Sequence, residues 1–219
     1  MAKHESIIVP DGCNKVLLHA CCAPCSSAIV EWLLAHKIEP VIYYYNPNIY
    51  PLEEYEIRKN ESKRHAESLG ITWIDDDRFR NNRSSESEIR TGASQQSCYQ
   101  AMHEAWQASV CGLENEPERG KRCEACFYHR LLATAKKAQE LGIPYFATTL
   151  ASSRWKNLEQ INAAGEKAAE IVNSSHPDAI RFWAQNWRKD GLQERRNALL
   201  KEYGFYNQTY CGCEFSMNR

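Results

Sequence analysis

Apolar and polar positions along this chain predict strands that alternate with helices. Four short apolar runs, rich in β-branched and aromatic residues, predict buried strands at 15–19, 38–45, 71–75 and 143–150. Helical spacing, together with capping and stop residues, predicts helices at 26–37, 52–69, 96–110, 123–141, 157–173, 179–189 and 192–203. This alternation is typical of an α/β fold with a mainly parallel sheet, here with a helical C-terminal part.

The first predicted strand and helix are joined by a segment that carries several cysteines. Residues 20–27, ACCAPCSS, form a turn-like stretch, and Ser26 and Ser27 are reasonable N-cap residues for the helix. The carboxyl end of a strand in an open α/β sheet is where ligands bind. A polar stretch at 76–95 has little periodicity and is typical of an exposed loop or a lid.

Length and composition favour one domain in a reducing compartment. The 219 residues suffice for one hydrophobic core, with or without a small appendage. Apolar runs stay below the roughly 18 to 20 residues that cross a bilayer, and the N-terminus lacks the features of a signal peptide. We therefore expect a cytoplasmic protein with no membrane partner. The net charge of −1 means that any nucleic acid must bind to a local basic patch.

Ten cysteines are unusual for a cytoplasmic chain, and seven of them stand in three groups. Clustered cysteines in a reducing compartment more often bind metal or do redox work than form disulfides. The groups are Cys21 with Cys22 and Cys25, Cys123 with Cys126, and Cys211 with Cys213. The lone cysteines, Cys13, Cys98 and Cys111, are expected to be small core residues.

Cys123 and Cys126 form a Cys-x-x-Cys pair at a predicted helix start, where both thiolates can reach one metal site. Cys21 and Cys22 lie in a turn that can aim both side chains inward, and four thiolates are the usual ligands of a [4Fe–4S] cluster. A lone Cys-x-x-Cys also suits zinc or dithiol chemistry, and an adjacent pair can be core packing. Cys25 is a ligand, a ligand of a second metal ion, or a bystander.

The tail carries a different cysteine pattern. Cys211 and Cys213 are separated by Gly212, whose flexibility allows a small, strained disulfide of the labile, catalytic type. The alternative is two reduced cysteines without a role.

Five separated segments of this sequence resemble one enzyme family. They are LLHACCAPCSS at 17–27, YYYNPNIYPLEEYEIRKNE at 43–61, RCEACFYHRL at 122–131, TTLASSRWKN at 148–157 and YCGC at 210–213. In this order they resemble the QueH-type epoxyqueuosine reductases, from about Lys15 to Phe215. These enzymes catalyse the last step of queuosine synthesis, the reduction of epoxyqueuosine at the wobble position of tRNA.

The resemblance implies cofactors and roles for the cysteines. It assigns a [4Fe–4S] cluster to Cys21, Cys22, Cys123 and Cys126, and a redox-active pair to Cys211 and Cys213. Some family members look to carry a further metal ion beside the cluster, and the position that can be acidic there is Cys25 here. The tRNA anticodon stem-loop and an external electron donor are the implied partners.

The resemblance also implies a Rossmann-like fold related to the adenine-nucleotide α-hydrolases. No S-G-G-x-D-S loop is present, so we do not expect ATP use. We expect one catalytic domain at 15–219, with an N-terminal extension at 1–14. Within the domain we expect an α/β core at about 15–150 and a helical, tRNA-facing part at about 151–219.

Proton donors and RNA contacts are further candidates. His19, Tyr128 and His129 flank the cysteine motifs, although His19 can instead satisfy buried backbone groups. Asn46, Asn48 and Tyr50 follow a strand end and are candidates for holding the modified base, unless Asn and Pro serve only the turn.

A basic segment at 181–201 is the candidate for RNA binding. It holds six basic and two acidic residues, and aromatic residues lie among them. Arg195 and Arg196 are the substrate contacts that we select, and Arg154, Trp155 and Lys156 form a second basic group. Trp183 and Trp187 are four residues apart, which also fits the buried stripe of an amphipathic helix.

Three other functions compete with the reductase. A zinc-containing nucleic-acid-binding module without catalysis would be colourless. A thioredoxin-like protein would carry its Cys-x-x-Cys after the first strand, unlike this chain. A cluster-dependent tRNA thiolation enzyme would need the ATP-binding loop that this sequence lacks.

Overall fold

A computed structural model describes residues 7–75, 92–174 and 179–217. Its centre is a sheet of five parallel strands in the order β3-β2-β1-β4-β5. The strands are β1 (Lys15–His19), β2 (Glu39–Tyr44), β3 (Trp73–Asp75), β4 (Tyr145–Thr148) and β5 (Arg181–Phe182). The predicted α/β fold with a parallel sheet is confirmed. The strand order reverses beside β1, and such a reversal is where open parallel sheets hold ligands.

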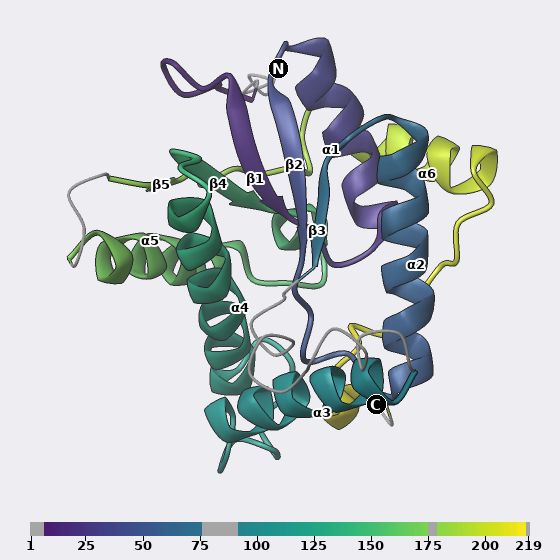
Figure 1. Cartoon of the computed structure of the whole chain (residues 1–219), viewed down its shortest axis with the longest axis vertical. Helices are drawn as coiled ribbons and strands as arrows, with labels where there is room; N and C mark the ends of the chain where they lie inside the picture. Colours follow the sequence, from purple (N-terminus) through teal and green to yellow (C-terminus); the bar gives the residue numbers. More distant parts are fainter. Residues whose placement is uncertain (1–6, 76–91, 175–178, 218–219) are drawn as a thin grey trace, which may run out of the picture.

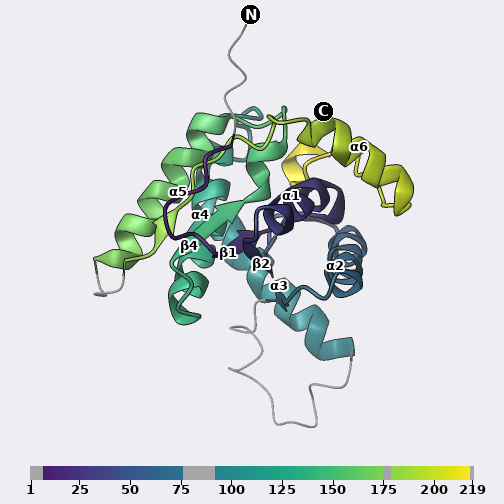
Figure 2. The same cartoon turned by 90° about the horizontal axis from the view of Figure 1, so that it is seen from above.

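Helices cover both faces of this sheet (Figure 1 and Figure 2). They are α1 (Ala23–Ala35), α2 (Leu52–Ser68), α3 (Gly92–Ser109), α4 (Lys121–Glu140), α5 (Leu158–Asn173) and α6 (Leu192–Glu202). The helix α4 packs against α5 on one side, while α1 packs against α2 and α6 on the other. Buried strand residues such as Leu17, Leu18 and Phe146 fill the core between these layers.

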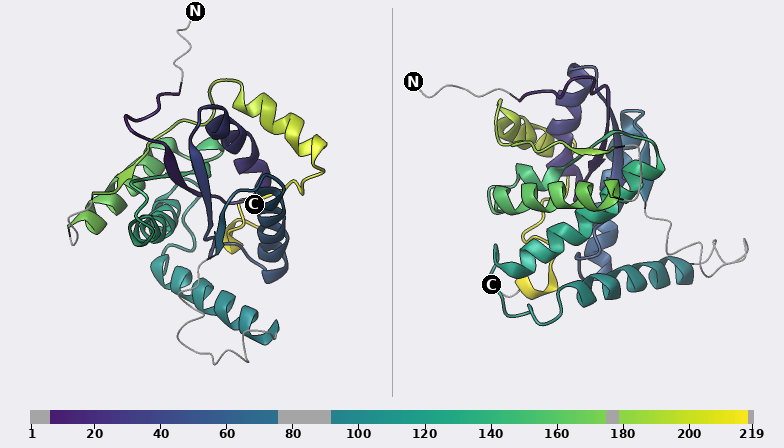
Figure 3. Two further views of the ribbon diagram at one scale, coloured as in Figure 1. Left: turned by 45° about the horizontal axis from the view of Figure 1, so that its top comes forward. Right: turned by 90° about the vertical axis from the view of Figure 1, so that its left-hand side faces the viewer.

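The tail after α6 runs along α2 and ends beside α3 (Figure 1 and Figure 3). It closes with a short 3₁₀ turn, η4 (Glu214–Ser216). Phe215 stacks on Trp106 of α3 with ring centroids 6.0 Å apart, and Gln107 of α3 donates a hydrogen bond to Glu214. The tail therefore belongs to the folded body and brings Cys211 beside α2 and Cys213 beside α3.

The first helix starts earlier than its sequence predicts. Its N-cap is Cys22, not Ser26 or Ser27, and Pro24 lies in its first turn. Proline is tolerated there because the first N–H groups of a helix have no intrahelical partner. Both serine hydroxyls donate instead to backbone carbonyls of the preceding turn.

The predicted helix at 179–189 is wrong. The segment forms β5 and then continues without regular structure. Its Trp183 N–H donates to the Phe146 carbonyl, which extends the pairing with β4. Trp183 and Trp187 are both buried, so their spacing of four reflects core packing in an irregular segment. The C-terminal part thus holds a strand as well as the helices α5 and α6.

Residues before β1 pack onto the body. The Ile7 N–H donates to Asp190, and the hydroxyl of Tyr145 donates to the Asp11 carbonyl. Most of the polar stretch predicted as a loop or lid, residues 76–91, lies outside the described residues, and its last four residues begin α3. Within the described part of the chain, no helix combines the length and apolar character needed to cross a bilayer.

Candidate functional site

Cysteines from three distant segments line one cavity of about 810 Å³. The lining cysteines are Cys21, Cys25, Cys123, Cys126, Cys211 and Cys213. The first segment follows the carboxyl end of β1, the second opens α4, and the third belongs to the tail. Parallel strands place their carboxyl ends at one edge, which brings the turn after β1 near the elements that pack there.

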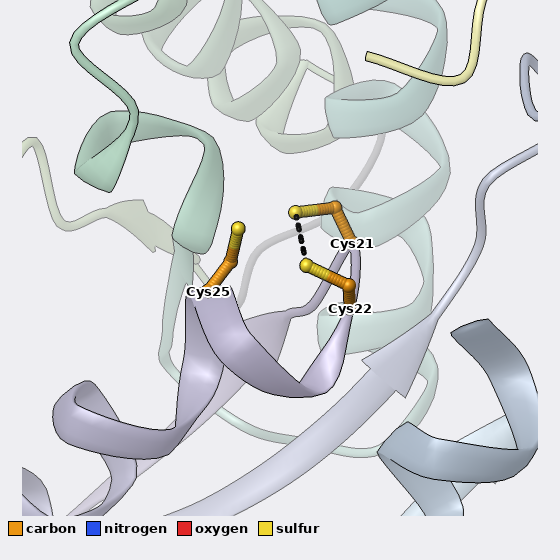
Figure 4. A group of neighbouring side chains, drawn as sticks. All are labelled: Cys21, Cys22 and Cys25. Carbon is orange, nitrogen blue, oxygen red and sulfur yellow. Dashed lines mark hydrogen bonds between the residues drawn. The ribbon is translucent and has the colours of Figure 1, made fainter. Parts of the chain in front are cut away.

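The tightest group of sulfurs lies at the start of α1 (Figure 4). The Sγ atoms of Cys21 and Cys22 are 3.8 Å apart, and Cys25 joins them with all three sulfurs within 4.8 Å of one another. Cys22 and Cys25 are three residues apart at the helix start and so share a face. Within the described residues, no other group of three or more potential metal ligands has all its ligand atoms within 4.8 Å of one another.

Two residues that were not among the predicted site residues hydrogen-bond to these sulfurs. The Thr149 hydroxyl, in the 3₁₀ turn η3 (Thr149–Ser152), accepts from the Cys21 N–H at 3.2 Å and donates to its sulfur at 3.5 Å. The Gln208 amide donates to Cys22 at 3.1 Å. Hydrogen bonds from Cys22 and Cys25 lower the pKa of Cys21, while burial raises the pKa of Cys22. Cys21 is therefore the most readily deprotonated of the three thiols.

Cys123 and Cys126 lie near the amino end of α4, as predicted. The backbone N–H of Arg119, just before the helix, donates to the Cys123 sulfur at 3.3 Å. Cys126 is buried in a small apolar cluster with Trp106, Val110 and Cys213. This packing puts the Cys-x-x-Cys pair directly beside the cysteines of the tail.

The tail cysteines form a compact pair around Gly212. The Cys213 N–H donates to the Cys211 sulfur at 3.4 Å. Hydrogen bonding from the Cys213 thiol lowers the pKa of Cys211 to about 5, and the pKa of Cys213 is raised. Gly212 has φ +101°, and a Cβ there would meet the Ile49 side chain at 2.8 Å. Only glycine suits this position, because the conformation is left-handed and the neighbour is close.

Arg58 of α2 holds the segment that carries Cys211 and Cys213 in place. It is buried and paired with Glu54, with Nη2 and Oε1 2.5 Å apart. Its two terminal nitrogens donate to the carbonyls of Cys211 at 3.3 Å and Tyr210 at 3.2 Å. Arginine suits this task because its planar fork serves several acceptors at once. The sequence placed Arg58 inside a family motif but gave no signal of this contact.

Positive charge dominates the rest of the cavity wall. One acidic residue, Glu118, faces seven basic residues, which are Arg58, Arg119, Arg122, Arg130, Arg154, Lys156 and Arg196. Arg122 and Arg130 are almost fully buried, and two guanidinium nitrogens of Arg122 and one of Arg130 have no hydrogen-bond partner among the described residues. Seven basic residues against one acidic residue give this wall a positive charge, which suits an anionic occupant. Free thiols in this number, beside such cations, fit a group that takes thiolate ligands.

Comparison with known proteins decides the family. The sequence profile described as "Epoxyqueuosine reductase QueH" matches residues 16–219. The chain belongs to this family. Curated QueH relatives include a protein of Haemophilus influenzae, 43% identical over 213 residues, which are 97% of this chain and 76% of the relative. Others are from Histophilus somni, 43% identical over 95% of this chain and 74% of the relative, and Acinetobacter baylyi, 42% identical over 95% and 83%. All three are named epoxyqueuosine reductase QueH.

The two asparagines predicted to hold the modified base occupy different places in this QueH-family chain. Asn48 lines the cavity, and its buried Oδ1 has no hydrogen-bond partner among the described residues. Asn46 is fully buried, donates to the Ala20 carbonyl at 2.9 Å and accepts from Arg130 at 2.5 Å. Asn46 thus orients a cation of the cavity wall, whereas Asn48 faces the cavity. Tyr50 is partly exposed and stacks on His103.

His19 is fully buried between two partners. Its Nε2 lies 3.1 Å from the Tyr45 carbonyl and its Nδ1 lies 2.7 Å from the Thr148 hydroxyl. Burial and the charge of Arg130 lower the pKa of His19 to about 3, so its ring is neutral at physiological pH. The neutral ring must donate from Nε2 to the carbonyl, and Nδ1 then accepts from Thr148. These contacts fit the alternative of satisfying buried polar groups.

Tyr128 and His129 are not among the residues that line the cavity. The Lys167 ammonium lies 4.6 Å from the centre of the Tyr128 ring, and the His129 Nε2 lies 3.0 Å from the Tyr45 hydroxyl. Their proton-donor roles stay predictions.

The two selected arginines of α6 differ in their surroundings. Arg195 makes a bidentate ion pair with Glu31, at 2.6 and 2.7 Å, whereas Arg196 lines the cavity. Arg154, Trp155 and Lys156 also line it. Of the lone cysteines, Cys13 is buried as expected and Cys98 is half-buried, but Cys111 is exposed, so its expected core position is wrong. Cys111 follows the end of α3 at a turn, where the chain leaves the core.

Proposed function

We propose that this chain reduces epoxyqueuosine in tRNA to queuosine, and that Cys21, Cys22, Cys123 and Cys126 hold a [4Fe–4S] cluster. Family membership supports the reaction. The observation that carries the site is that thiols from three distant segments line one cavity with a cationic wall. When bound, the cluster supplies one-electron transfer at this cavity.

The reaction fixes what the protein must deliver. Deoxygenation of an epoxide to an alkene breaks two C–O bonds, forms a C=C double bond and releases the oxygen as water. This reaction consumes two electrons and two protons. Oxidation of two thiols to a disulfide releases the same two electrons and two protons. In our proposal, Cys211 and Cys213 store these electrons. The two residues are already in contact, because the Cys213 backbone N–H donates to the Cys211 sulfur at 3.4 Å. An external donor then reduces the pair again.

Substrate binding follows from the cations of the wall. Backbone phosphates of a single-stranded RNA loop attract arginine and lysine. Arg154, Lys156 and Arg196 line the cavity from the loop after η3 and from α6. Asn48 is our candidate for hydrogen bonding to the base, because its Oδ1 lacks a partner among the described residues.

The test uses tRNA that carries epoxyqueuosine, with product nucleosides separated by liquid chromatography and identified by mass. Cys211→Ser should keep the visible chromophore of the purified protein and lose turnover with a one-electron donor. Cys111→Ser is the matched control, because it removes an exposed thiol outside the cavity lining and should keep both. Normal turnover by Cys211→Ser would rule out the thiol pair as electron store.

A zinc-binding nucleic-acid module is the second candidate, and one observation favours it. The three sulfurs of Cys21, Cys22 and Cys25 lie within 4.8 Å of one another, a spacing that one zinc ion accepts. In the reductase, Cys25 would instead contribute to a second metal ion beside the cluster. Metal analysis separates these cases, since a zinc protein is colourless and contains no sulfide.

A further inference from the structure

Trp155 is an exposed indole at the wall of the cysteine cavity. This residue is 79% exposed, whereas the other five tryptophans are buried or half-buried. Among the exposed large apolar side chains of the described residues, Trp155 is the one that lines the cavity. Tryptophan is mostly buried in proteins, and an exposed indole that lines a cavity offers a stacking face to a ligand bound there.

The loop that carries Trp155 is held by arginines from two other segments. The guanidinium of Arg119 donates to the carbonyls of Arg154 and Trp155, both at 3.0 Å. Arg188 donates to the next carbonyl, that of Lys156, at 2.8 Å. Three consecutive carbonyls are thus fixed by two planar cations, which leaves the indole exposed on a restrained backbone.

The same contacts tie the indole to the cysteine site. The backbone N–H of Arg119 donates to the Cys123 sulfur at 3.3 Å, and its carbonyl accepts from Gln160 of α5 at 2.7 Å. Arg119 also has φ +67°, a conformation that costs energy for a residue other than glycine. Arg119 therefore helps to position both the loop that carries Trp155 and Cys123 of the cavity.

The surroundings of Trp155 select the chemistry of its ligand. Arg154 and Lys156 flank it in the sequence, and Arg196 lines the same cavity. A lone indole among cations does not suit an apolar protein surface, which would need a contiguous apolar patch. An aromatic face beside phosphate-binding cations is how proteins hold an unpaired nucleotide.

We propose that Trp155 stacks on an unpaired base of the RNA loop, next to the nucleotide that enters the cavity. This role rests on the proposed function, because it requires an RNA hairpin as the ligand. The stacked base would anchor the loop, and the neighbouring nucleotide would reach the cysteines.

The experiment measures the affinity of the anaerobically purified holoenzyme for a synthetic anticodon stem-loop with guanine at the wobble position. Base stacking on an aromatic residue predicts about 5- to 150-fold weaker binding by Trp155→Ala. Trp155→Phe keeps a stacking face and should recover most of the affinity. Ile8→Ala is the matched control, since Ile8 is equally exposed, at 79%, and lies outside the cavity lining.

A second set of RNAs identifies the contact itself. Each unpaired nucleotide of the loop is replaced in turn by an abasic one. One abasic RNA should bind the wild type more weakly, and this loss should disappear in Trp155→Ala because the stacking partner is already gone.

If the wild type binds the hairpin and reduces the modified tRNA, and Trp155→Ala binds the hairpin equally well, the stacking role alone is overturned. Persistence of every abasic effect in Trp155→Ala would overturn it as well. A wild type that neither binds the hairpin nor reduces the tRNA would overturn the proposed function, and the stacking role with it.

Discussion

Replacing Arg58 by leucine should both destabilise the protein and release its tail cysteines. The Arg58 and Glu54 side chains are 2% and 9% exposed, so the variant leaves a buried carboxylate without its cation. Breaking a buried ion pair from one side costs about 3–5 kcal/mol. For a chain of this size, that loss lowers the melting temperature by roughly 6 to 20 °C.

The same substitution removes two hydrogen bonds from the tail, those to the carbonyls of Tyr210 and Cys211. At about 1 kcal/mol each, their loss should raise the open fraction of this segment by roughly tenfold or more. The assay is the alkylation rate of Cys211 and Cys213, followed by peptide mass mapping, together with denaturant unfolding of the holoenzyme.

The double variant Glu54→Leu/Arg58→Leu separates the two effects. It removes the unpaired charge and should regain most of the stability, yet the tail carbonyls still lack their donor. Lys63→Leu, on the exposed side of α2, is the control and should change stability by less than about 1 kcal/mol. The reasoning is refuted if Arg58→Leu unfolds at the wild-type denaturant concentration, or if the double variant restores wild-type cysteine protection.

Three further predictions follow from the packing and charges. Gly165→Val should lower the free energy of unfolding, measured with denaturant, by about 1–3 kcal/mol or more. The reason is that even a Cβ at Gly165 would meet the Phe182 ring at 2.5 Å, and an unchanged free energy of unfolding would contradict this packing. Asn46→Ala should lower turnover and cost about 1–3 kcal/mol, because the buried Arg130 and the Ala20 carbonyl lose their partner; unchanged turnover and stability would exclude a role in orienting Arg130. Arg196→Gln should reduce the salt dependence of RNA binding by about 0.7 in the log–log slope. Arg195→Gln should reduce it less, since Glu31 already pairs with Arg195, and equal effects would show that this pair opens in the complex.

Local patterns predicted the elements that position the site. The strand at 15–19 ends just before Cys21, and the helix that carries Cys123 and Cys126 starts within two residues of its expected position. Short apolar runs and a Cys-x-x-Cys after a polar loop are local signals, so one sequence suffices to find them. Their metal-binding role stays a prediction.

Contacts between residues far apart in the chain could not be predicted from the sequence. Arg58 reaches Cys211 across the fold, and Arg119 reaches Trp155, although neither partner is close in the chain. A buried arginine with carbonyl acceptors and a solvated surface arginine look the same in a sequence. The failure at 179–189 has a related cause, because pairing of Trp183 with β4 outweighed a local spacing that favours a helix.

Iron and acid-labile sulfide per chain, measured after purification without oxygen, test the central claim most directly. The wild type and Cys111→Ser should each hold about four iron atoms and four sulfides, and Cys123→Ser should lose them together with its visible absorption. Stoichiometric zinc without iron or sulfide in the wild type, or undiminished iron and sulfide in Cys123→Ser, would contradict a cluster held by cysteines from separate segments of this chain.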